Sequence, residues 1–281
     1  MTMPRFTSLP VLDCVSFGQA PAHAGEYHFF ALHLERPLDP VAGKPLWHDW
    51  KPGQFAMLRP AGWGMDLIWA RPLSICQVTD QALIFFFQVA GRGTRQMAKM
   101  RRHDIVNIWG PLGNGFAVES GGPTLLLAGG IGLAPFLGYA DVHPQPHSLR
   151  LMFAHRAPSG CYPLDRLNPA VQLEDRPENS PADRDVFLAD VAAAIGDTAT
   201  LSGLILACGP MPFLRYVREC SLTVKARAQL SLESRMGCGT GACLGCVVMP
   251  APANPAAGEH LLPLRACVDG PVFWADQIAA E

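Results

Sequence analysis

Short apolar runs separated by proline and glycine turns fill the first part of the chain, from about Tyr27 to Phe116. The runs with the length of strands are 27–34, 54–59, 72–76 and 82–89. Closely spaced strands of this kind predict a small antiparallel β-barrel. The segment from Asp39 to Lys51, with its tryptophans and prolines, is predicted to be a loop, and we assign it no role.

A second pattern begins near Gly122. Strand-length apolar runs at 124–128, 149–154 and 204–208 alternate with segments of helical character at 135–140 and 211–220. Such alternation predicts a parallel sheet with helices packed on both of its faces. From Leu222 onward the chain carries grouped cysteines and a loop rich in proline and alanine at 250–263. We therefore predict three parts, a barrel at 1–119, an α/β domain at 120–221 and a small C-terminal module at 222–281.

The composition is that of an ordinary globular protein, with 49% apolar and 16% charged residues in a chain of 281. The formal net charge of −2 gives no electrostatic reason to expect binding to nucleic acid or to an anionic membrane. The uncharged stretch 124–140 is too short and too rich in glycine for a membrane span. Because the N-terminal residues lack the apolar core of a signal peptide, we expect a cytoplasmic protein.

The spacing of four of the nine cysteines carries chemical information. Cys238, Cys243, Cys246 and Cys267 follow the pattern C-x4-C-x2-C-x20-C, which matches the plant-type pattern of thiolates that hold a [2Fe-2S] cluster. Glycines between the first three let the backbone fold tightly and turn its amides toward the sulfurs. A zinc site is one alternative, although such sites usually have a second C-x2-C pair or histidine partners. A disulfide pair is the other, and it needs an oxidising compartment.

Two segments of the predicted barrel have the chemistry to bind a flavin nucleotide. In Arg71-Pro-Leu-Ser, the guanidinium suits a diphosphate because it is always charged and donates a fork of hydrogen bonds. The Ser74 hydroxyl can reach the edge of the isoalloxazine ring. In the run Gly-Arg-Gly-Thr that ends at Thr94, a turn that opens a helix presents backbone amides to an anion. Each segment alone also fits a plain strand or a plain turn.

Two turns at the ends of predicted parallel strands are candidates for a dinucleotide site. The first contains Gly129, Gly130 and Gly132, whose missing side chains permit a dinucleotide to approach the backbone. The second, Cys208-Gly209-Pro210, is expected to lie beside the first and to border the nicotinamide. A glycine-rich turn alone is weak evidence, and Cys208 also fits a core residue at the end of a strand.

These segments together resemble the ferredoxin–NADP reductase superfamily. The cysteine block 231–246, with Gly110-Pro-Leu-Gly-Asn-Gly-Phe and Cys267-Val-Asp-Gly-Pro-Val-Phe, is similar to the electron transfer subunit family of bacterial dihydroorotate dehydrogenase (class 1B). The resemblance covers essentially the whole chain. It implies FAD in the barrel, NAD in the second domain and a [2Fe-2S] cluster in the C-terminal module. Carried over by motif, the flavin-binding residues are Arg71, Pro72, Leu73, Ser74, Phe86, Phe87, Gln88, Gly93 and Thr94.

The resemblance also implies a division of labour. A separate FMN-containing catalytic subunit oxidises dihydroorotate to orotate in pyrimidine (UMP) synthesis, and its electrons reach NAD through the cluster and FAD of this chain. Two copies of each chain are expected to form a heterotetramer, in which the C-terminal module forms part of the interface. Candidates for that contact are Leu244, Val272, Phe273 and Trp274, although each also fits a residue of the core. No residue of this chain needs to act as an acid or a base. The alternatives are another reductase-type subunit, linked to ferredoxin or hydrogenase, and a non-catalytic iron–sulfur redox sensor.

Signals for NAD and for NADP conflict. An acidic residue after the second parallel strand would favour NAD, because a carboxylate binds the free ribose hydroxyl. That strand instead ends in His155-Arg156, which by position suits a 2′-phosphate. The resemblance implies NAD, and we expect NAD.

Overall fold

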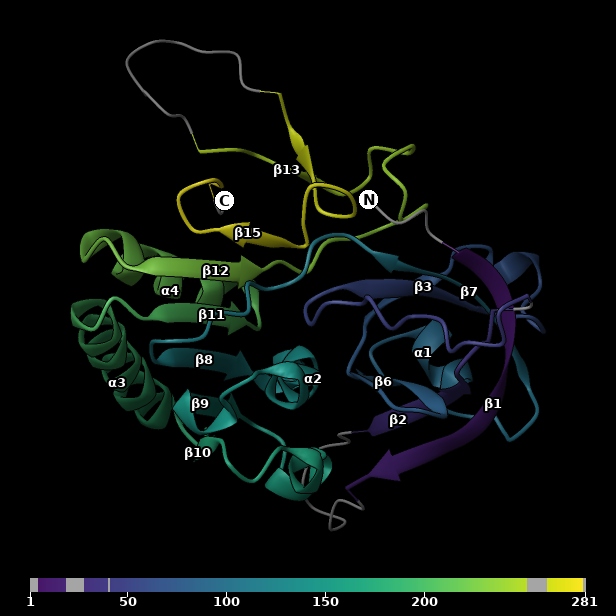
Figure 1. The fold of residues 1–281 in the computed structure, drawn as a ribbon, viewed down its shortest axis with the longest axis horizontal. Helices are drawn as coiled ribbons and strands as arrows, with labels where there is room; N and C mark the ends of the chain where they lie inside the picture. Colours follow the sequence, from purple (N-terminus) through teal and green to yellow (C-terminus); the bar gives the residue numbers. More distant parts are fainter. Residues whose placement is uncertain (1–4, 19–27, 40, 252–261, 280–281) are drawn as a thin grey trace.

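The computed structural model describes residues 5–18, 28–39, 41–251 and 262–279 (Figure 1). Tyr27 and most of the predicted loop at 250–263 lie outside these ranges. Two sheet-based domains stand side by side, and the cysteine-rich segment lies across their junction (Figure 1).

Seven antiparallel strands form the first domain, in the order β4-β3-β7-β1-β2-β6-β5. The edge strands β4 and β5 are separated in the chain only by Ile75 and Cys76, so the sheet has to curl until its edges approach each other. This confirms the predicted barrel-like architecture, in partly open form. The elements are β1 (Arg5–Phe17), β2 (Phe29–Glu35), β3 (Phe55–Pro60), η1 (Met65–Leu67), β4 (Arg71–Ser74), β5 (Gln77–Val78), β6 (Ala82–Gln88), α1 (Arg92–Met97) and β7 (Ile105–Leu112).

Strand β6 shows why the apolar runs of this domain are continuous. Leu83, Phe85 and Phe87 enter the barrel core, whereas Ile84 and Phe86 enter the core shared with the second domain. Successive side chains of a strand point to opposite faces. A strand that is covered on both faces is therefore apolar along its whole length.

The second domain is a six-stranded sheet in the order β10-β9-β8-β11-β12-β15, parallel except for β15. Helix α2 packs on the face toward the barrel, and α3 and α4 cover the opposite face (Figure 1). The predicted parallel sheet with helices on both faces is confirmed. Its elements are β8 (Thr124–Gly129), η2 (Gly130–Leu133), α2 (Ala134–Val142), η3 (Pro146–Ser148), β9 (Leu149–His155), η4 (Ser159–Cys161), η5 (Leu164–Arg166), β10 (Gln172–Pro177), α3 (Pro181–Thr200), β11 (Leu204–Cys208), α4 (Met211–Thr223), β12 (Arg227–Ser231) and β15 (Val272–Trp274).

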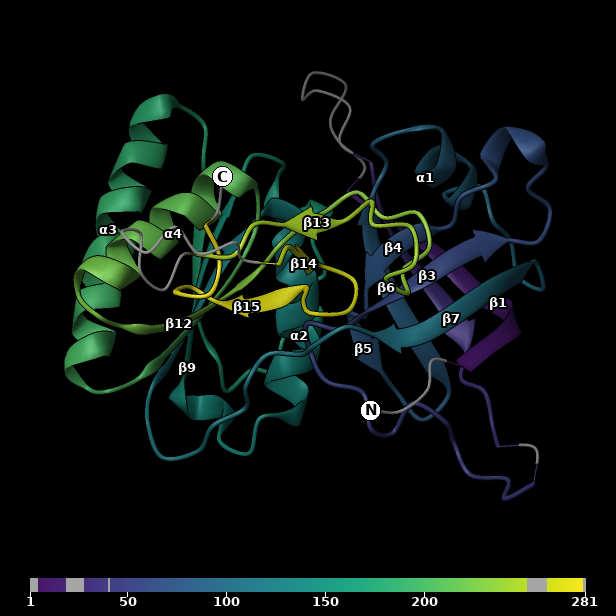
Figure 2. The same cartoon turned by 90° about the horizontal axis from the view of Figure 1, so that it is seen from above.

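The cysteine-rich segment is anchored in both domains. Its flanking strands β12 and β15 belong to the six-stranded sheet, so the predicted division at residue 222 cuts through that sheet. Between them, β13 (Val247–Val248) and β14 (Leu264–Arg265) form a short pair that lies over the junction in Figure 2. On the barrel side, Asn114 Nδ2 donates to the Asp269 carbonyl (2.6 Å). Trp109 Nε1 donates to the Cys238 carbonyl (3.0 Å), so the barrel holds the cysteine loop directly.

The predicted loop at 39–51 helps to join the two domains. Trp47 is buried in the barrel core and lies against Gly110. Trp50 lies against Gly138 of α2, where an added Cβ would meet its ring at 2.5 Å. The two tryptophans therefore give this loop a packing role, which the sequence did not reveal.

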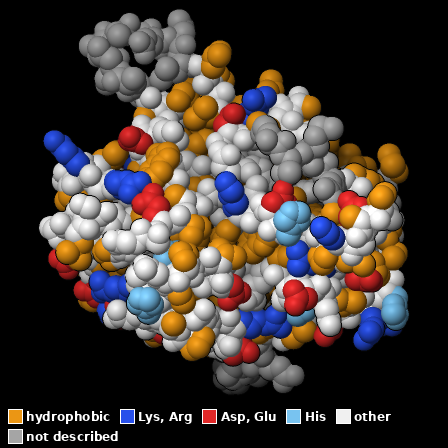
Figure 3. All heavy atoms as spheres, viewed as in Figure 1, with side chains coloured by type: hydrophobic (Ala, Val, Ile, Leu, Met, Phe, Trp, Pro, Cys, Tyr) orange, Lys and Arg blue, Asp and Glu red, His pale blue; other side chains and the backbone are white. Residues whose placement is uncertain are grey.

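Charges of both signs are mixed over the face seen in Figure 3, without a large area of one sign. This agrees with the small net charge of the chain. Among the described residues, no helix has both the length and the apolar character needed to cross a membrane.

Candidate cofactor and cluster sites

The four cysteines predicted to hold a cluster lie on one loop and one neighbouring turn. Cys246 Sγ lies 3.2 Å from Cys267 Sγ. Cys238 Sγ accepts hydrogen bonds from the amides of Thr240 and Cys243, each at 3.4 Å. Cys267 Sγ accepts one from the amide of Gly241 at 3.2 Å. Backbone amides that point at sulfur are the surroundings in which thiolates and iron–sulfur clusters are stabilised.

Two glycines allow this loop to adopt its shape. Gly239 (φ 74°) and Gly241 (φ 82°) have left-handed backbone conformations that disfavour residues with a Cβ. An added Cβ at Gly239 would lie 2.5 Å from Met57 Cγ of the barrel. The glycines between the cysteines thus allow the loop to turn, and Gly239 also allows it to pack closely against β3.

The four thiols differ in burial and in acidity. Cys246 and Cys267 are buried, Cys238 is half-buried and Cys243 is exposed. Burial raises the pKa of Cys238, but the amide hydrogen bonds outweigh this effect and lower the pKa to about 6. Burial, together with the adjacent Cys246 sulfur, raises the pKa of Cys267 to about 12. Because thiolates bind iron, metal binding here is expected to release a proton from Cys267.

The donor set fits a two-iron cluster. A [2Fe-2S] cluster needs four thiolates, two for each iron, and Cys246 with Cys267 forms one such close pair. Within the described ranges, no three His, Cys, Asp or Glu side chains are close enough together to hold a single metal ion. The exposed Cys243 places one edge of the site at the protein surface.

A cavity of about 370 Å³, here called the smaller cavity, opens between the two domains and the cysteine segment. Its walls are mainly apolar with a few polar groups, which suits a flat aromatic ring. Most of the residues that were predicted to bind the flavin ring lie here. The lining residues are Phe55, Pro72, Leu73, Ser74, Phe86, Phe87, Gln88, Ala90, Ile131, Gly132, Ala134, Cys208, Ser231, Leu232, Glu233, Ser234, Met236 and Pro271.

Arg71 and Gly93 meet next to the smaller cavity without lining it. An added Cβ at Gly93 would collide with the Arg71 guanidinium. Arg71 Nη1 donates to the Trp69 carbonyl (2.6 Å), and its guanidinium carbon lies 5.2 Å from the centre of the Trp63 ring. Partial burial lowers the pKa of Arg71. A partly buried cation that has no carboxylate partner among the described residues fits an anion supplied by a ligand.

Thr94 holds the turn that precedes α1. Its Oγ1 accepts hydrogen bonds from the amides of Ala90 (2.9 Å) and Gly91 (3.1 Å) and donates to the Gly91 carbonyl (3.3 Å). The hydroxyl is therefore used to close the turn before α1. Thr94 thereby shapes the backbone next to Arg71, and its contact with the cofactor stays a prediction.

A larger cavity of about 800 Å³ adjoins the smaller one. Gln88, Ile131 and Glu233 line both cavities. The larger cavity extends over Gly129 and Gly130 and over the ends of β9 and β10. This edge of a parallel sheet is where dinucleotides bind in open α/β folds.

The two predicted dinucleotide turns lie against each other. An added Cβ at Gly129 would lie 2.9 Å from Pro210 Cδ, and one at Gly209 would lie 3.1 Å from the Gly129 Cα. An added Cβ at Gly132 would collide with the Cys208 carbonyl. The glycines therefore allow the turns after β8 and β11 to pack together beneath the larger cavity.

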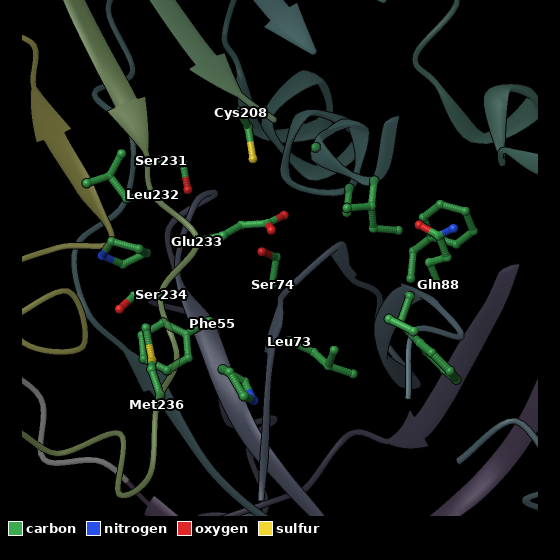
Figure 4. Close-up of a pocket in the computed structure, with 18 residues that line it drawn as sticks. Phe55, Leu73, Ser74, Gln88, Cys208, Ser231, Leu232, Glu233, Ser234 and Met236 are labelled. Atoms are coloured by element: carbon green, nitrogen blue, oxygen red, sulfur yellow. The ribbon is translucent and has the colours of Figure 1, made fainter. Parts of the chain in front are cut away.

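Glu233 marks the meeting point of the two cavities. Figure 4 shows its carboxylate between Cys208 and Ser74, with all three side chains pointing into the smaller cavity. Glu233 retains exposed surface because both cavities are open, but the protein atoms around it raise the pKa of its carboxyl. Burial raises the pKa of Cys208 to about 12, so this thiol stays protonated.

The segment 231–236 carries Ser231, Glu233 and Met236 into the smaller cavity. From the sequence it was only part of the cysteine block, without a predicted role in cofactor binding. The position in the sheet could have indicated this role, because the segment begins at the last residue of β12 and continues beyond it, and β12 pairs in parallel with β11. Residues after a parallel strand lie at the ligand-binding edge of such a sheet.

The cysteine segment matches a known family model. Residues 233–279 match the iron-sulfur cluster binding domain of dihydroorotate dehydrogenase B. Over 236 residues the chain is 33% identical to the dihydroorotate dehydrogenase B (NAD(+)) electron transfer subunit of Caldanaerobacter subterraneus, covering 82% of this chain and 90% of the relative. The protein of the same description from Listeria monocytogenes serovar 1/2a is 31% identical over 242 residues, covering 81% and 87% of the two chains.

Several solved structures are similar to this chain in fold. An NADH-dependent reduced ferredoxin–NADP oxidoreductase aligns with a TM-score of 0.69 at 21% identity, covering 96% of this chain and 89% of the other. Ferredoxin–NADP+ reductase from Plasmodium falciparum aligns with a TM-score of 0.58 at 10% identity, covering 77% and 88%. These similarities establish the ferredoxin reductase-like fold.

Proposed function

Since this chain belongs to the family of electron transfer subunits of dihydroorotate dehydrogenase B, we propose that it carries electrons from a catalytic partner to NAD through a [2Fe-2S] cluster and FAD. The partner is proposed to be an FMN-containing subunit that oxidises dihydroorotate to orotate. In that reaction dihydroorotate gives up two electrons and two protons, and NAD+ takes up two electrons and one proton.

One observation carries this proposal: a single short segment connects all three candidate sites. Glu233 lines both cavities, and Met236 lines the smaller one. Cys238, the first proposed cluster ligand, follows Met236 by two residues, which span at most about 7 Å of extended chain. The segment runs from the larger cavity past the smaller one to the cysteine loop, which supports a path for electrons between a dinucleotide, a flavin and a cluster.

The residues present fit FAD in the smaller cavity. Apolar groups such as Leu73 and Phe86 would cover the ring, and Arg71 would hold the diphosphate beside Gly93. When bound, FAD exchanges electrons singly with an iron–sulfur cluster and in pairs, as hydride, with nicotinamide. The chain itself supplies the binding surface, the orientation and the exclusion of water.

Replacing Arg71 with alanine is expected to weaken FAD binding by about 2–5 kcal/mol, because a partly desolvated diphosphate would lose its charged partner. Flavin retention after gel filtration and a titration with FAD measure this. Arg71→Lys should retain part of the affinity, since the charge remains. Arg36→Ala is the matched control, because Arg36 is also a barrel arginine that donates to backbone carbonyls. Equal flavin retention in Arg71→Ala and the wild type would contradict the assignment.

Glu233→Gln is expected to slow hydride transfer between NADH and FAD by about tenfold to a hundredfold, because Glu233 lies where nicotinamide has to meet the flavin. Rapid mixing with NADH, followed by flavin bleaching, gives this rate separately from NADH affinity. Glu219→Gln, an exposed change on α4, should leave the rate unaltered. An unchanged rate of flavin bleaching in Glu233→Gln would contradict a role for Glu233 in hydride transfer.

The proposed partner surface surrounds the exposed edge of the cysteine loop. Leu244 is 63% exposed and follows the exposed Cys243. Trp69 is 57% exposed, and its ring lies close to Gly237 in the same loop. Of the candidates named from the sequence, Val272 and Phe273 are buried in the cores, which agrees with the alternative of a core role and removes them from this surface. Exposed apolar side chains beside an exposed ligand suit a partner that receives or donates electrons there.

The rival functions predict different absorption spectra and different assay results. A non-catalytic redox sensor would lack FAD, so a flavin spectrum in the purified chain contradicts it. A subunit linked to ferredoxin or hydrogenase would show NADH-dependent dye reduction but no dihydroorotate-dependent NAD reduction with the catalytic partner. Positive results in both assays support the proposed function.

A further inference from the structure

The corner of the larger cavity at the ends of β9 and β10 shows how the chain can distinguish NAD from NADP. The expected acidic residue is missing after β9, where His155 and Arg156 stand. The neighbouring strand supplies one instead. Pro177 pairs with His155 in the parallel register, and the Glu178 amide donates to the His155 carbonyl (2.7 Å). Glu178 therefore stands beside Arg156 at the same edge of the sheet.

Glu178 and Arg156 both line the larger cavity and form an ion pair. The distance from Arg156 Nε to Glu178 Oε2 is 3.4 Å. The Glu178 side chain is 17% exposed, whereas that of Arg156 is 69% exposed. The carboxylate is thus the inner member of the pair, and the cation that suited a 2′-phosphate by position is already engaged with it.

The other charged groups at this corner also disfavour a bound 2′-phosphate. Arg184 Nη2 lies 3.7 Å from Asp185 Oδ1, so the second arginine that lines the cavity also has a carboxylate partner. The N-terminus of α3 is occupied as well. Asp183 Oδ2 accepts hydrogen bonds from the amides of Asn179 (2.9 Å) and Ser180 (2.8 Å). A phosphate dianion would meet carboxylates at each of these positions.

A buried histidine fixes the geometry of the corner. His155 Nδ1 lies 2.5 Å from the Ala157 carbonyl, and Nε2 lies 2.5 Å from Asp175 Oδ1 on β10. Ser159 Oγ donates to Asp175 Oδ2 (2.7 Å). These contacts tie the turn after β9 to β10. The position of Arg156 relative to Glu178 is therefore set by packing beneath the cavity.

We propose that Glu178 is the residue that selects NAD over NADP, acting from the strand beside the one that usually carries the acid. Its carboxylate accepts a hydrogen bond from the free 2′-hydroxyl of the adenosine ribose and repels a phosphate at that position. This inference rests on the proposed use of a nicotinamide dinucleotide in the larger cavity.

Calorimetric titration with AMP and with adenosine 2′,5′-bisphosphate tests the selection without electron transfer or a partner. The purified holoprotein should bind AMP more tightly. Glu178→Gln, which keeps the shape and removes the charge, should shift the ratio of the two affinities toward the bisphosphate by roughly tenfold to a hundredfold. In Glu178→Gln/Arg156→Ala that gain should disappear, because the released arginine is what binds the phosphate.

Asp185→Asn removes the same charge from a side chain that is 72% exposed at the same corner, and it should shift the ratio far less. An equal shift in Asp185→Asn, an unchanged ratio in Glu178→Gln, or a wild type that prefers the bisphosphate would each overturn the proposal. FAD content and melting temperature show whether the variants fold. If they do not, the comparison of AMP with the bisphosphate on the wild type still tests the proposal. If neither nucleotide binds, the dinucleotide site itself is wrong. If both nucleotides bind and Glu178→Gln leaves the ratio of their affinities unchanged, the dinucleotide site stands and only the role of Glu178 is wrong.

Discussion

Replacing Cys267 with serine is expected to remove most of the visible iron–sulfur absorbance while FAD stays bound. Cys267 Sγ lies 3.2 Å from Cys246 Sγ and accepts a hydrogen bond from the amide of Gly241. If these two cysteines bind one iron, the loss of Cys267 would leave that iron with half of its protein ligands. The smaller cavity, proposed to hold FAD, has walls in the barrel and the parallel sheet that do not depend on Cys267. The same result is expected for Cys238, Cys243 and Cys246. Absorption spectra and iron and sulfide analysis measure the effect.

Cys220→Ser is the matched control for this experiment. Cys220 lies on α4 and is half-buried, so its replacement should leave the iron content unchanged. The assignment of the fourth ligand would be wrong if Cys267→Ser kept a full cluster. Loss of both cluster and flavin in Cys267→Ser would instead mean that the cysteine loop is needed to close the smaller cavity, which the FAD content of Cys238→Ser would check.

The elements that were predicted from the sequence are those with continuous apolar runs. Strands β3, β8 and β11 are buried along almost their whole length, so each gives a clear signal. Strand β10 was missed because it lies at the edge of its sheet, and its sequence QLEDRP is largely polar. Helix α3 was also missed, although Ser180 and Asp183 form a capping box that could have marked its start.

The site residues divide in a similar way. The cysteines and the glycine turns could be proposed from the sequence, because their chemistry follows from spacings along the chain. Roles for Glu178 and Glu233 were not predicted, because each residue follows one strand of the sheet and contributes to a site at the end of the neighbouring strand. That relation depends on the strand order of the sheet, in which β10 flanks β9 and β12 flanks β11. A single sequence does not display strand order, whereas the structure does.

Orotate is expected to form only when the catalytic partner is present. The two cavities and the cysteine loop are assigned to the dinucleotide, FAD and the cluster, and the proposed chemistry on dihydroorotate belongs to the partner. The isolated protein should reduce dyes with NADH and give no orotate. Adding the FMN-containing subunit should produce dihydroorotate-dependent NADH formation, and light scattering should give the mass of two copies of each chain. Dihydroorotate oxidation by this chain alone would contradict the whole division of labour.

The interface can be tested through Leu244, which combines 63% exposure with a left-handed backbone (φ 55°). Leu244→Asp should lower dihydroorotate-dependent NAD reduction by about tenfold or more, since it places a charge at an apolar contact, while aspartate tolerates the left-handed conformation. Leu201→Asp is the control, because Leu201 is 65% exposed at the end of α3, away from the cysteine loop. NADH-driven dye reduction and iron–sulfur absorbance show whether the cofactors remain in place. If Leu201→Asp lowers the coupled activity as much as Leu244→Asp does, the partner does not dock at the cysteine loop.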